Sequence, residues 1–189
     1  MPGSTGKGAR RRADLARAAA TLLLREGPGA LTHRRVAHEA GASVSATTYY
    51  FGGLDELAAA AGGALAQGWA AHARSVVVRH TTESVSDDPW AAAALVADAV
   101  LPAGDDADVR SYYEHLLGAG RTRALAVAFA EGRAAVDSAV DELVGRVGAP
   151  TGAAVTIALV DGAVVSALTE HRPVRPTAQA LLVAAWGGP

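Results

Sequence analysis

The chain lacks cysteine and contains a single lysine, and these two absences exclude several kinds of chemistry. Without cysteine it has neither a disulfide framework nor a thiolate metal site. The only lysine, Lys7, lies near the N-terminus. We therefore expect neither Schiff-base catalysis by a lysine in the body nor a P-loop.

Catalytic and metal-binding motifs are also missing. The sequence has no GxSxG motif of serine hydrolases and no HExxH pair, and its six histidines are not spaced as metal ligands. Asp105, Asp106 and Asp108 cluster in a predicted loop, where they either bind a hard cation or cap a helix. Because no glutamate or glycine follows at the spacing of a calcium loop, the pattern favours the cap. We predict no enzymatic activity, no cofactor and no bound metal.

Long apolar runs are absent, although half of the residues are hydrophobic. The most apolar segment, 153–168, is interrupted by Asp161 and is too short to span a bilayer. The N-terminus is polar and lacks the apolar run of a signal peptide. These features predict a cytoplasmic protein with a packed core and no membrane association.

Residues 31–57, LTHRRVAHEAGASVSATTYYFGGLDEL, have the pattern of a helix, a tight turn and a second helix. Thr32 is placed to cap the first helix through its hydroxyl. Gly41 ends that helix, where a left-handed residue is needed, and Ser43 caps the next one. Ala37 and Gly41 are small and four residues apart, so the two helices can cross closely, as a helix-turn-helix requires.

The second of these helices carries small hydroxyl and methyl groups, which suit a helix that enters the major groove of DNA. Serine and threonine can bond base edges, an alanine methyl can contact a thymine methyl, and tyrosine hydroxyls can reach phosphates. The alternative is a helical hairpin that does not bind DNA and whose tyrosines pack on a core. The residues predicted to contact DNA are Thr32, Arg34, Arg35, Ser43, Ser45, Ala46, Thr47, Thr48, Tyr49 and Tyr50.

Charge is divided unevenly along the chain. Residues 1–50 hold eight basic and three acidic residues, whereas residues 51–189 hold nine arginines and sixteen acidic residues. A basic N-terminal part on an acidic body is typical of a DNA-binding head. Arg10, Arg11 and Arg12 lie where the chain enters the first helix. They either reach the DNA backbone or the neighbouring minor groove, or belong to a solvated basic tail.

Residues 12–57 resemble the N-terminal domain of TetR-family (tetracycline-repressor-like) transcriptional regulators. The matching features are an amphipathic first helix, then THRRVAHEAGASVS, then TTYYF, and an acidic pair followed by Leu57. Two positions depart from the family pattern. Thr48 stands where a tyrosine is frequent, and Leu54 stands where a lysine commonly contacts a DNA phosphate, so one phosphate contact is expected to be missing.

With this resemblance, the sequence predicts an all-α protein with two helical domains. The glycine-rich residues 1–8 are expected to form a disordered basic tail. A three-helix helix-turn-helix DNA-binding domain follows at 9–53, and a helical ligand-binding and dimerisation domain at 54–189. The resemblance implies a repressor that is released from DNA by a small-molecule effector. The alternative is a helical ligand-binding or protein-interaction module that has lost DNA binding.

The segment 151–187 is predicted to form a homodimer interface. Its first helix is apolar nearly all round, and such a helix must be buried on every side. The resemblance implies that the last two helices pair with those of a second subunit. Two recognition helices related by a two-fold axis would then read a palindromic double-stranded operator.

The resemblance also implies an effector pocket in the body, and aromatic rings with polar tips are the side chains that such pockets use. Packing in the core is the alternative for each aromatic residue. Asp161 either holds a ligand amine or pairs with an arginine across the dimer interface. The candidate pocket residues are Trp69, Trp90, Tyr112, Tyr113, His115, Phe129 and Asp161.

Overall fold

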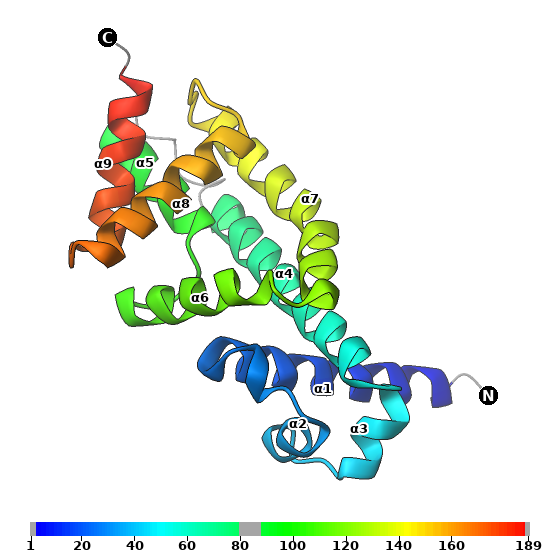
Figure 1. The fold of residues 1–189 in the computed structure, drawn as a ribbon. Coiled ribbons are helices and arrows are strands. Elements are labelled where there is room, and N and C mark those ends of the chain that lie inside the picture. Colours follow the sequence, from blue (N-terminus) through cyan, green and yellow to red (C-terminus); the bar gives the residue numbers. More distant parts are fainter. Residues whose placement is uncertain (1–2, 80–87, 188–189) are drawn as a thin grey trace. The chain divides into compact units, whose positions relative to one another are not determined.

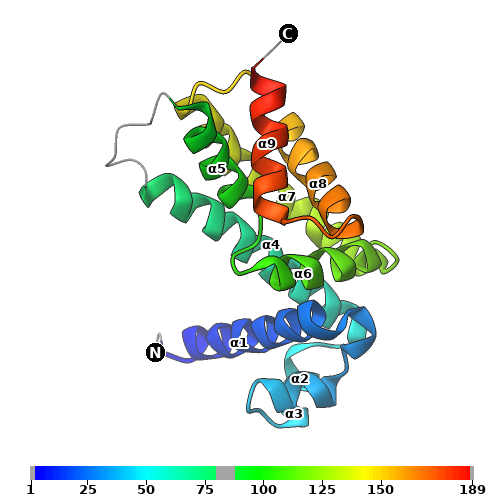
Figure 2. The same cartoon turned by 90° about the vertical axis from the view of Figure 1, so that its left-hand side faces the viewer.

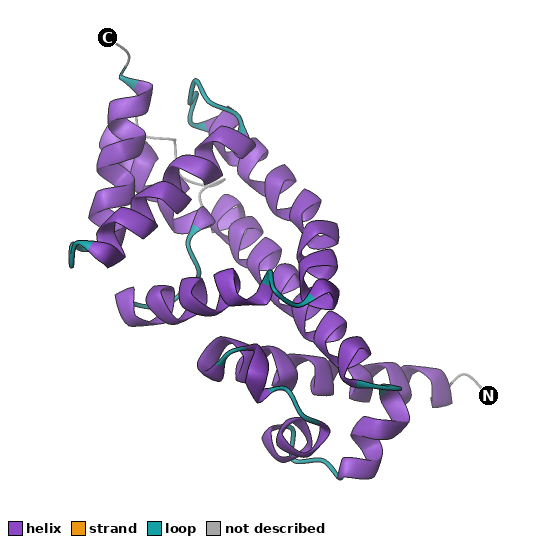
Figure 3. Ribbon diagram, viewed as in Figure 1, coloured by secondary structure: helices purple, strands orange, loops and turns teal. Residues whose placement is uncertain are grey.

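The structure, a computed structural model, describes residues 3–79 and 88–187. Within them the chain forms nine α-helices and one short 3₁₀ helix, with no strand (Figure 3), which confirms the predicted all-α fold class. The helices are α1 (Gly3–Glu26), α2 (His33–Glu39), α3 (Val44–Tyr50), α4 (Leu54–Arg79), α5 (Pro89–Val100), α6 (Asp106–Ala119), α7 (Arg123–Arg146), α8 (Ala153–Thr169) and α9 (Val174–Trp186), and the 3₁₀ turn η1 is Pro28–Ala30 (Figure 1). None of the helices in these residues is long and apolar enough to cross a lipid bilayer.

The chain forms two compact units. Unit 1 comprises residues 1–67 and 111–132, and unit 2 comprises residues 68–110 and 133–189. This grouping differs from the domain boundary expected at residue 54. The reason is that Leu57, Ala58 and Ala61 of α4 are buried in the same hydrophobic core as α1.

Helix α1 begins at Gly3, so residues 3–8, which the sequence predicted to be disordered, are helical. Residues 1–2 lie outside the described part of the chain. Lys7 and the arginines that follow it are good helix formers, and no proline interrupts this stretch. The basic residues at the start of the chain are therefore fixed on a helix.

The core of unit 1 joins α1, α4 and the turn that follows α3. Leu15 of α1, Leu57 of α4 and Phe51 of the turn are all at most 1% exposed. The Arg12 guanidinium lies 4.8 Å from the centre of the Phe51 ring, over its face. These contacts fix the end of α3 against the two long helices.

Helices α4 and α7 approach closely at two glycines. A Cβ atom on Gly62 would lie 2.9 Å from the Cβ of Ala128, and one on Gly132 would overlap the Cβ of Ala66. Glycine inside a helix costs about 1 kcal/mol relative to alanine. At Gly62 and Gly132 a larger side chain would clash across the α4–α7 contact, so glycine is favoured there despite its low helix propensity.

The Gly132→Ala variant is expected to lower the free energy of unfolding by about 1–3 kcal/mol, because the added methyl group overpacks the α4–α7 contact. Gly63 is the matched control, since a Cβ there would meet nothing within 4 Å. Gly63→Ala should raise the free energy of unfolding by roughly 0.5–1 kcal/mol through helix propensity. Urea unfolding of both variants checks this, and equal effects would contradict the packing explanation.

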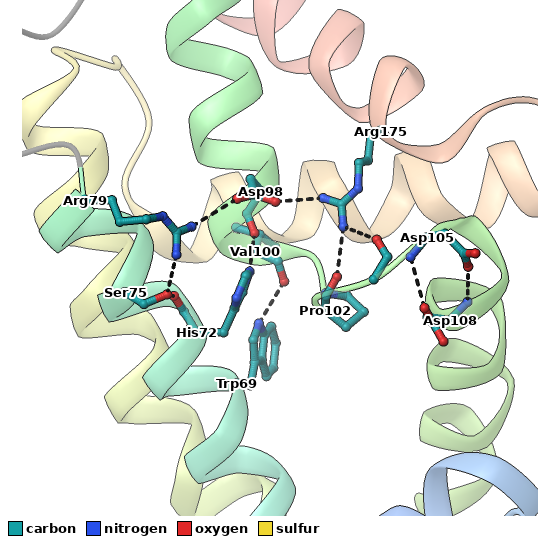
Figure 4. A network of polar contacts seen from close by, with 11 residues as sticks. Trp69, His72, Ser75, Arg79, Asp98, Val100, Pro102, Asp105, Asp108 and Arg175 are labelled. Carbon is teal, nitrogen blue, oxygen red and sulfur yellow. Dashed lines mark hydrogen bonds and ion pairs between the residues drawn. The ribbon is translucent and has the colours of Figure 1, made fainter. Parts of the chain in front are cut away.

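In unit 2, α9 packs against α8 and α5 (Figure 2). Ile157 and Val164 of α8, Leu182 of α9 and Val96 of α5 are fully buried. Asp98 of α5 also joins this unit through polar contacts, as its carboxylate accepts a 3.0 Å hydrogen bond from Arg175 of α9 (Figure 4).

The acidic cluster at 105–108 caps α6. The Asp105 carboxylate accepts hydrogen bonds from the backbone N–H groups of Ala107 and Asp108, at 2.8 and 3.0 Å. Asp108 in turn accepts a 3.0 Å bond from the N–H of Asp105, and Asp106 accepts one of 3.0 Å from the N–H of Val174. Of the two interpretations of this cluster, the helix cap is the one that the geometry supports.

Candidate functional site

Helices α2 and α3 form a helix-turn-helix whose ends are capped as the sequence predicts. The Thr32 hydroxyl accepts a 3.2 Å hydrogen bond from the N–H of Arg35, and the Ser43 hydroxyl accepts one of 3.2 Å from the N–H of Ala46. Gly41 has a φ of 55°, the left-handed conformation that the turn requires. The caps fix both helix starts and so fix the direction of α3.

The outer face of α3 carries side chains suited to DNA. Ser45, Thr48 and Tyr49 are exposed, Tyr49 to 81%, while Ala46 and Tyr50 are half-buried. The Tyr49 and Tyr50 rings pack edge to face with their centres 5.0 Å apart. Tyr49 therefore lies on an open helix face, whereas Tyr50 is partly buried against the core of unit 1.

Thr47 was predicted to contact DNA, but it is fully buried. Its hydroxyl donates 2.7 Å to the carbonyl oxygen of Val44 and lies 3.3 Å from the carbonyl oxygen of His33 in α2. A side chain enclosed between α2 and α3 cannot reach a base edge. Thr47 is therefore a packing residue of the helix-turn-helix.

The two arginines of α2 have different surroundings. Arg34 is exposed, and within the described residues it pairs with no carboxylate. Arg35 forms an ion pair with Glu26 at the end of α1. Hydrogen bonds from Arg35 and Arg25 lower the pKa of the Glu26 carboxyl below its ordinary value. Arg34 is thus the better placed of the two for an external anion, because Arg35 already holds α2 against α1.

Glu56 links three parts of unit 1 that support α3. Its carboxylate accepts a 2.8 Å hydrogen bond from the N–H of Gly52 and a 2.8 Å bond from Arg12. These two bonds lower the pKa of Glu56 below its ordinary value of 4.5, the bond from Gly52 more than the bond from Arg12. In the sequence, Glu56 is only the second residue of the acidic pair before Leu57, and no local signal indicates this link.

The pH dependence of stability follows from the lowered pKa of Glu56. In the folded chain the carboxylate is favoured, so its stabilising contribution is present above the ordinary pKa and is lost as the pH falls through the folded pKa. The difference in free energy of unfolding between the wild type and Glu56→Gln should therefore be largest near neutral pH and shrink in acid. Urea unfolding at several pH values measures it, with the exposed Glu131→Gln as control. A difference that grows in acid would contradict this role.

Three of the predicted effector residues line one small pocket in unit 1. Tyr112 and His115 of α6 and Phe129 of α7 line it with Leu23 and Leu65, and these side chains leave no room in it for a water molecule. The His115 imidazole also lies against the backbone of Gly27, where a Cβ atom would be 3.0 Å from Nδ1. The aliphatic part of this wall was missed, because in the sequence leucines that line a pocket look the same as leucines of the core.

The other candidate effector residues do not line this pocket. Tyr113 is buried, with its ring centre 5.7 Å from that of Tyr112. Trp69, Trp90 and Asp161 belong to unit 2. The Trp69 indole donates a 2.8 Å hydrogen bond to the carbonyl oxygen of Val100 (Figure 4), whereas Trp90 is half exposed. The predicted set is therefore split between two parts of the molecule.

Comparison with known proteins relates both the sequence and the fold to one group of regulators. A family profile described as "Tetracyclin repressor-like, C-terminal domain" matches residues 87–188. No curated protein sequence matches the chain significantly. The family match covers the part of the chain for which the sequence carried no recognisable motif.

Solved structures extend the similarity over nearly the whole chain. The multidrug binding protein EbrR complexed with malachite green is 31% identical, over 92% of this chain and 96% of that chain, with a TM-score of 0.63. The EbrR complex with ethidium is 30% identical over 92% and 97%, with a TM-score of 0.65. A member of the TetR family from Streptomyces coelicolor A3 is 29% identical over 92% and 96%, with a TM-score of 0.57. Together with the family match, this confirms the resemblance seen in the N-terminal residues, and the chain belongs to the TetR family of transcriptional regulators.

Proposed function

We propose that the protein is a ligand-responsive repressor that binds a palindromic DNA operator as a homodimer and leaves it when a small-molecule effector binds. The observation that carries the proposal is the outer face of α3. Ser45, Thr48 and Tyr49 are exposed on a helix whose direction is fixed by the Ser43 cap and by the buried Thr47. A rigid helix with short polar side chains on its free face suits the major groove.

The proposed DNA contacts are divided by chemistry. Ser45 and Thr48 would bond base edges, and Ala46 would contact a thymine methyl. Tyr49 and Tyr50 would bond phosphates through their hydroxyls. The phosphate contacts proposed around α2 and its turn are Thr32, Arg34, Arg35 and Ser43.

The proposed dimer uses the free face of α8 and α9 within 151–187. Val155 and Val165 of α8 are 54% and 51% exposed, and Leu181 of α9 is 37% exposed. The small residues Ala158 and Gly162 are exposed on the same side of α8. An apolar face with small residues is suited to close packing against a second copy.

The proposed effector site is the pocket lined by Tyr112, His115 and Phe129. Its aromatic walls suit the aromatic compounds named in the EbrR complexes, proflavin, ethidium and malachite green. The pocket has no room for even a water molecule, whereas a drug-sized site holds roughly 300–1,000 Å³, so such a ligand must enlarge it.

Enlargement supplies a physical reason for release. Leu23 and Leu24 of α1 form one wall of the pocket, and α1 packs against α2. A ligand that binds only the enlarged pocket shifts the population away from the conformation with the small pocket. If the conformation with the small pocket is the DNA-bound one, ethidium or malachite green displaces the operator.

The proposal is tested by selecting duplexes from a random-sequence library with the purified protein and measuring their affinity by fluorescence anisotropy. The expected result is a palindromic consensus that is bound far more tightly than a scrambled duplex. Titration with ethidium and malachite green should then release the DNA. Phe129→Ala should change the concentration of each compound at which half of the DNA is released. Failure to enrich any sequence would overturn DNA regulation and favour a helical module without DNA binding.

A further inference from the structure

A basic groove lies between the first turns of α1 and the end of α3, both within unit 1. It encloses about 880 Å³, and its lining includes Lys7, Arg10, Arg11, Tyr49 and Tyr50. Of the residues considered for DNA contact in the sequence, the groove includes Tyr49, Tyr50 and two of the three consecutive arginines, Arg10 and Arg11. The groove is therefore an additional surface beside the recognition helix.

The groove exists because α1 is helical from its start. Lys7, Arg10, Arg11 and Asp14 follow the spacing that places side chains on one face of a helix. Gly8 on the same helix lies against Tyr50, and a Cβ there would be 3.8 Å from the tyrosine oxygen. A flexible tail would not hold these side chains beside α3.

A second contact holds α1 along the helix-turn-helix. The Arg11 guanidinium donates a 3.4 Å hydrogen bond to the carbonyl oxygen of Gly41, in the turn between α2 and α3. Arg12 does not take part in the groove, because it lies over Phe51 and pairs with Glu56. The three consecutive arginines thus have two different roles, and only Arg10 and Arg11 line the groove.

The charge of the groove is strongly positive. Asp14 is the one acidic residue of its lining, and it pairs with Arg17 outside the groove. Within the described residues, neither Lys7 nor Arg10 pairs with a carboxylate. Cationic side chains beside phenol hydroxyls form a set of hydrogen-bond donors that suits phosphodiester oxygens.

We infer that this α1–α3 groove binds the sugar–phosphate backbone of DNA beside the bases that α3 contacts. The inference rests on the proposed DNA binding and adds a separate contact to it. Leu54, at the start of α4 beside the end of α3, is 49% exposed and carries no charge. Lys7, Arg10 and Arg11 supply positive charge to the backbone from α1 instead.

The test compares Lys7→Gln/Arg10→Gln with a control of equal charge change, Arg121→Gln/Arg123→Gln, on exposed arginines elsewhere in unit 1. The probe is a short duplex that wild-type protein enriches from a random library, titrated over a series of KCl concentrations. Each lost phosphate contact reduces the slope of log affinity against log salt by about 0.9. Because a dimer carries four substituted groups, the groove variant should lose about 3.6 units of slope and bind roughly hundredfold to thousandfold more weakly at physiological salt.

The control should keep the wild-type slope, and both variants should keep the wild-type base preference and thermal unfolding curve. Ethylation interference on the same duplex should show, at the flank of each half-site, phosphates that wild type requires and the groove variant does not. If the groove variant keeps the wild-type slope while the wild type binds selectively, the inference that the groove binds DNA is wrong and the proposed function is unaffected. If wild type enriches no duplex, the proposed function fails and the groove with it.

Discussion

Replacing Phe51 with alanine is expected to lower the free energy of unfolding by about 3–5 kcal/mol, because a large core side chain is lost and a cavity remains. Phe51 is 1% exposed, and it closes the core between α1, α4 and the end of α3. The substitution also removes the ring beneath the Arg12 guanidinium, 4.8 Å away. Urea unfolding followed by circular dichroism measures the loss.

Tyr49→Ala is the matched control, because it removes an aromatic ring two residues earlier that is 81% exposed. It should change the free energy of unfolding by no more than about 0.5 kcal/mol, yet weaken DNA binding through loss of a phosphate contact. The two variants therefore separate a residue that stabilises the position of α3, Phe51, from a residue of α3 that contacts DNA, Tyr49. A loss below about 1 kcal/mol for Phe51→Ala would contradict the role assigned to its ring.

Replacing Val165 with glutamate is expected to convert a homodimer into monomers. Val165 is 51% exposed on α8, so a single chain can accommodate the carboxylate in water. In a symmetric interface the substitution buries two unpaired charges, each of which costs several kcal/mol. A cost of about 4 kcal/mol raises the dissociation constant by roughly a thousandfold.

Light scattering at micromolar protein concentration measures this effect. Leu117→Glu is the control, because Leu117 is 72% exposed on α6 and lies outside 151–187. It should leave the dimer intact, whereas Val165→Glu should also abolish tight binding to a palindromic duplex. A monomeric wild-type protein, or equal effects of the two variants, would contradict the proposed interface.

The local structure of the helix-turn-helix was predictable because its signals are short-range. Thr32, Gly41 and Ser43 are recognised by their own chemistry and spacing, and the structure confirms all three. Thr47 could not be separated from Thr48 in the same way. Both are threonines on one short helix, and only the position of α2 decides that Thr47 is enclosed and Thr48 is open.

Features that depend on packing between distant segments were not predictable. Helix propensity alone disfavours the glycines of α4, but Gly62 is required by the close approach of α7. The glycine-rich composition of residues 1–8 favoured disorder, whereas residues 3–8 belong to α1. The pocket around His115 combines α1, α4, α6 and α7, and a single sequence carries no signal that joins four segments.

The division into two units also separates the natural chromophores of the protein. All three tryptophans, Trp69, Trp90 and Trp186, belong to unit 2, and all four tyrosines belong to unit 1. Tryptophan emission therefore reports on unit 2 alone, and tyrosine absorption changes report on unit 1. Since the chain has no cysteine, one introduced thiol can carry a dye at a single chosen position. The order in which the two units respond to an added compound can thus be followed optically, each through its own signal.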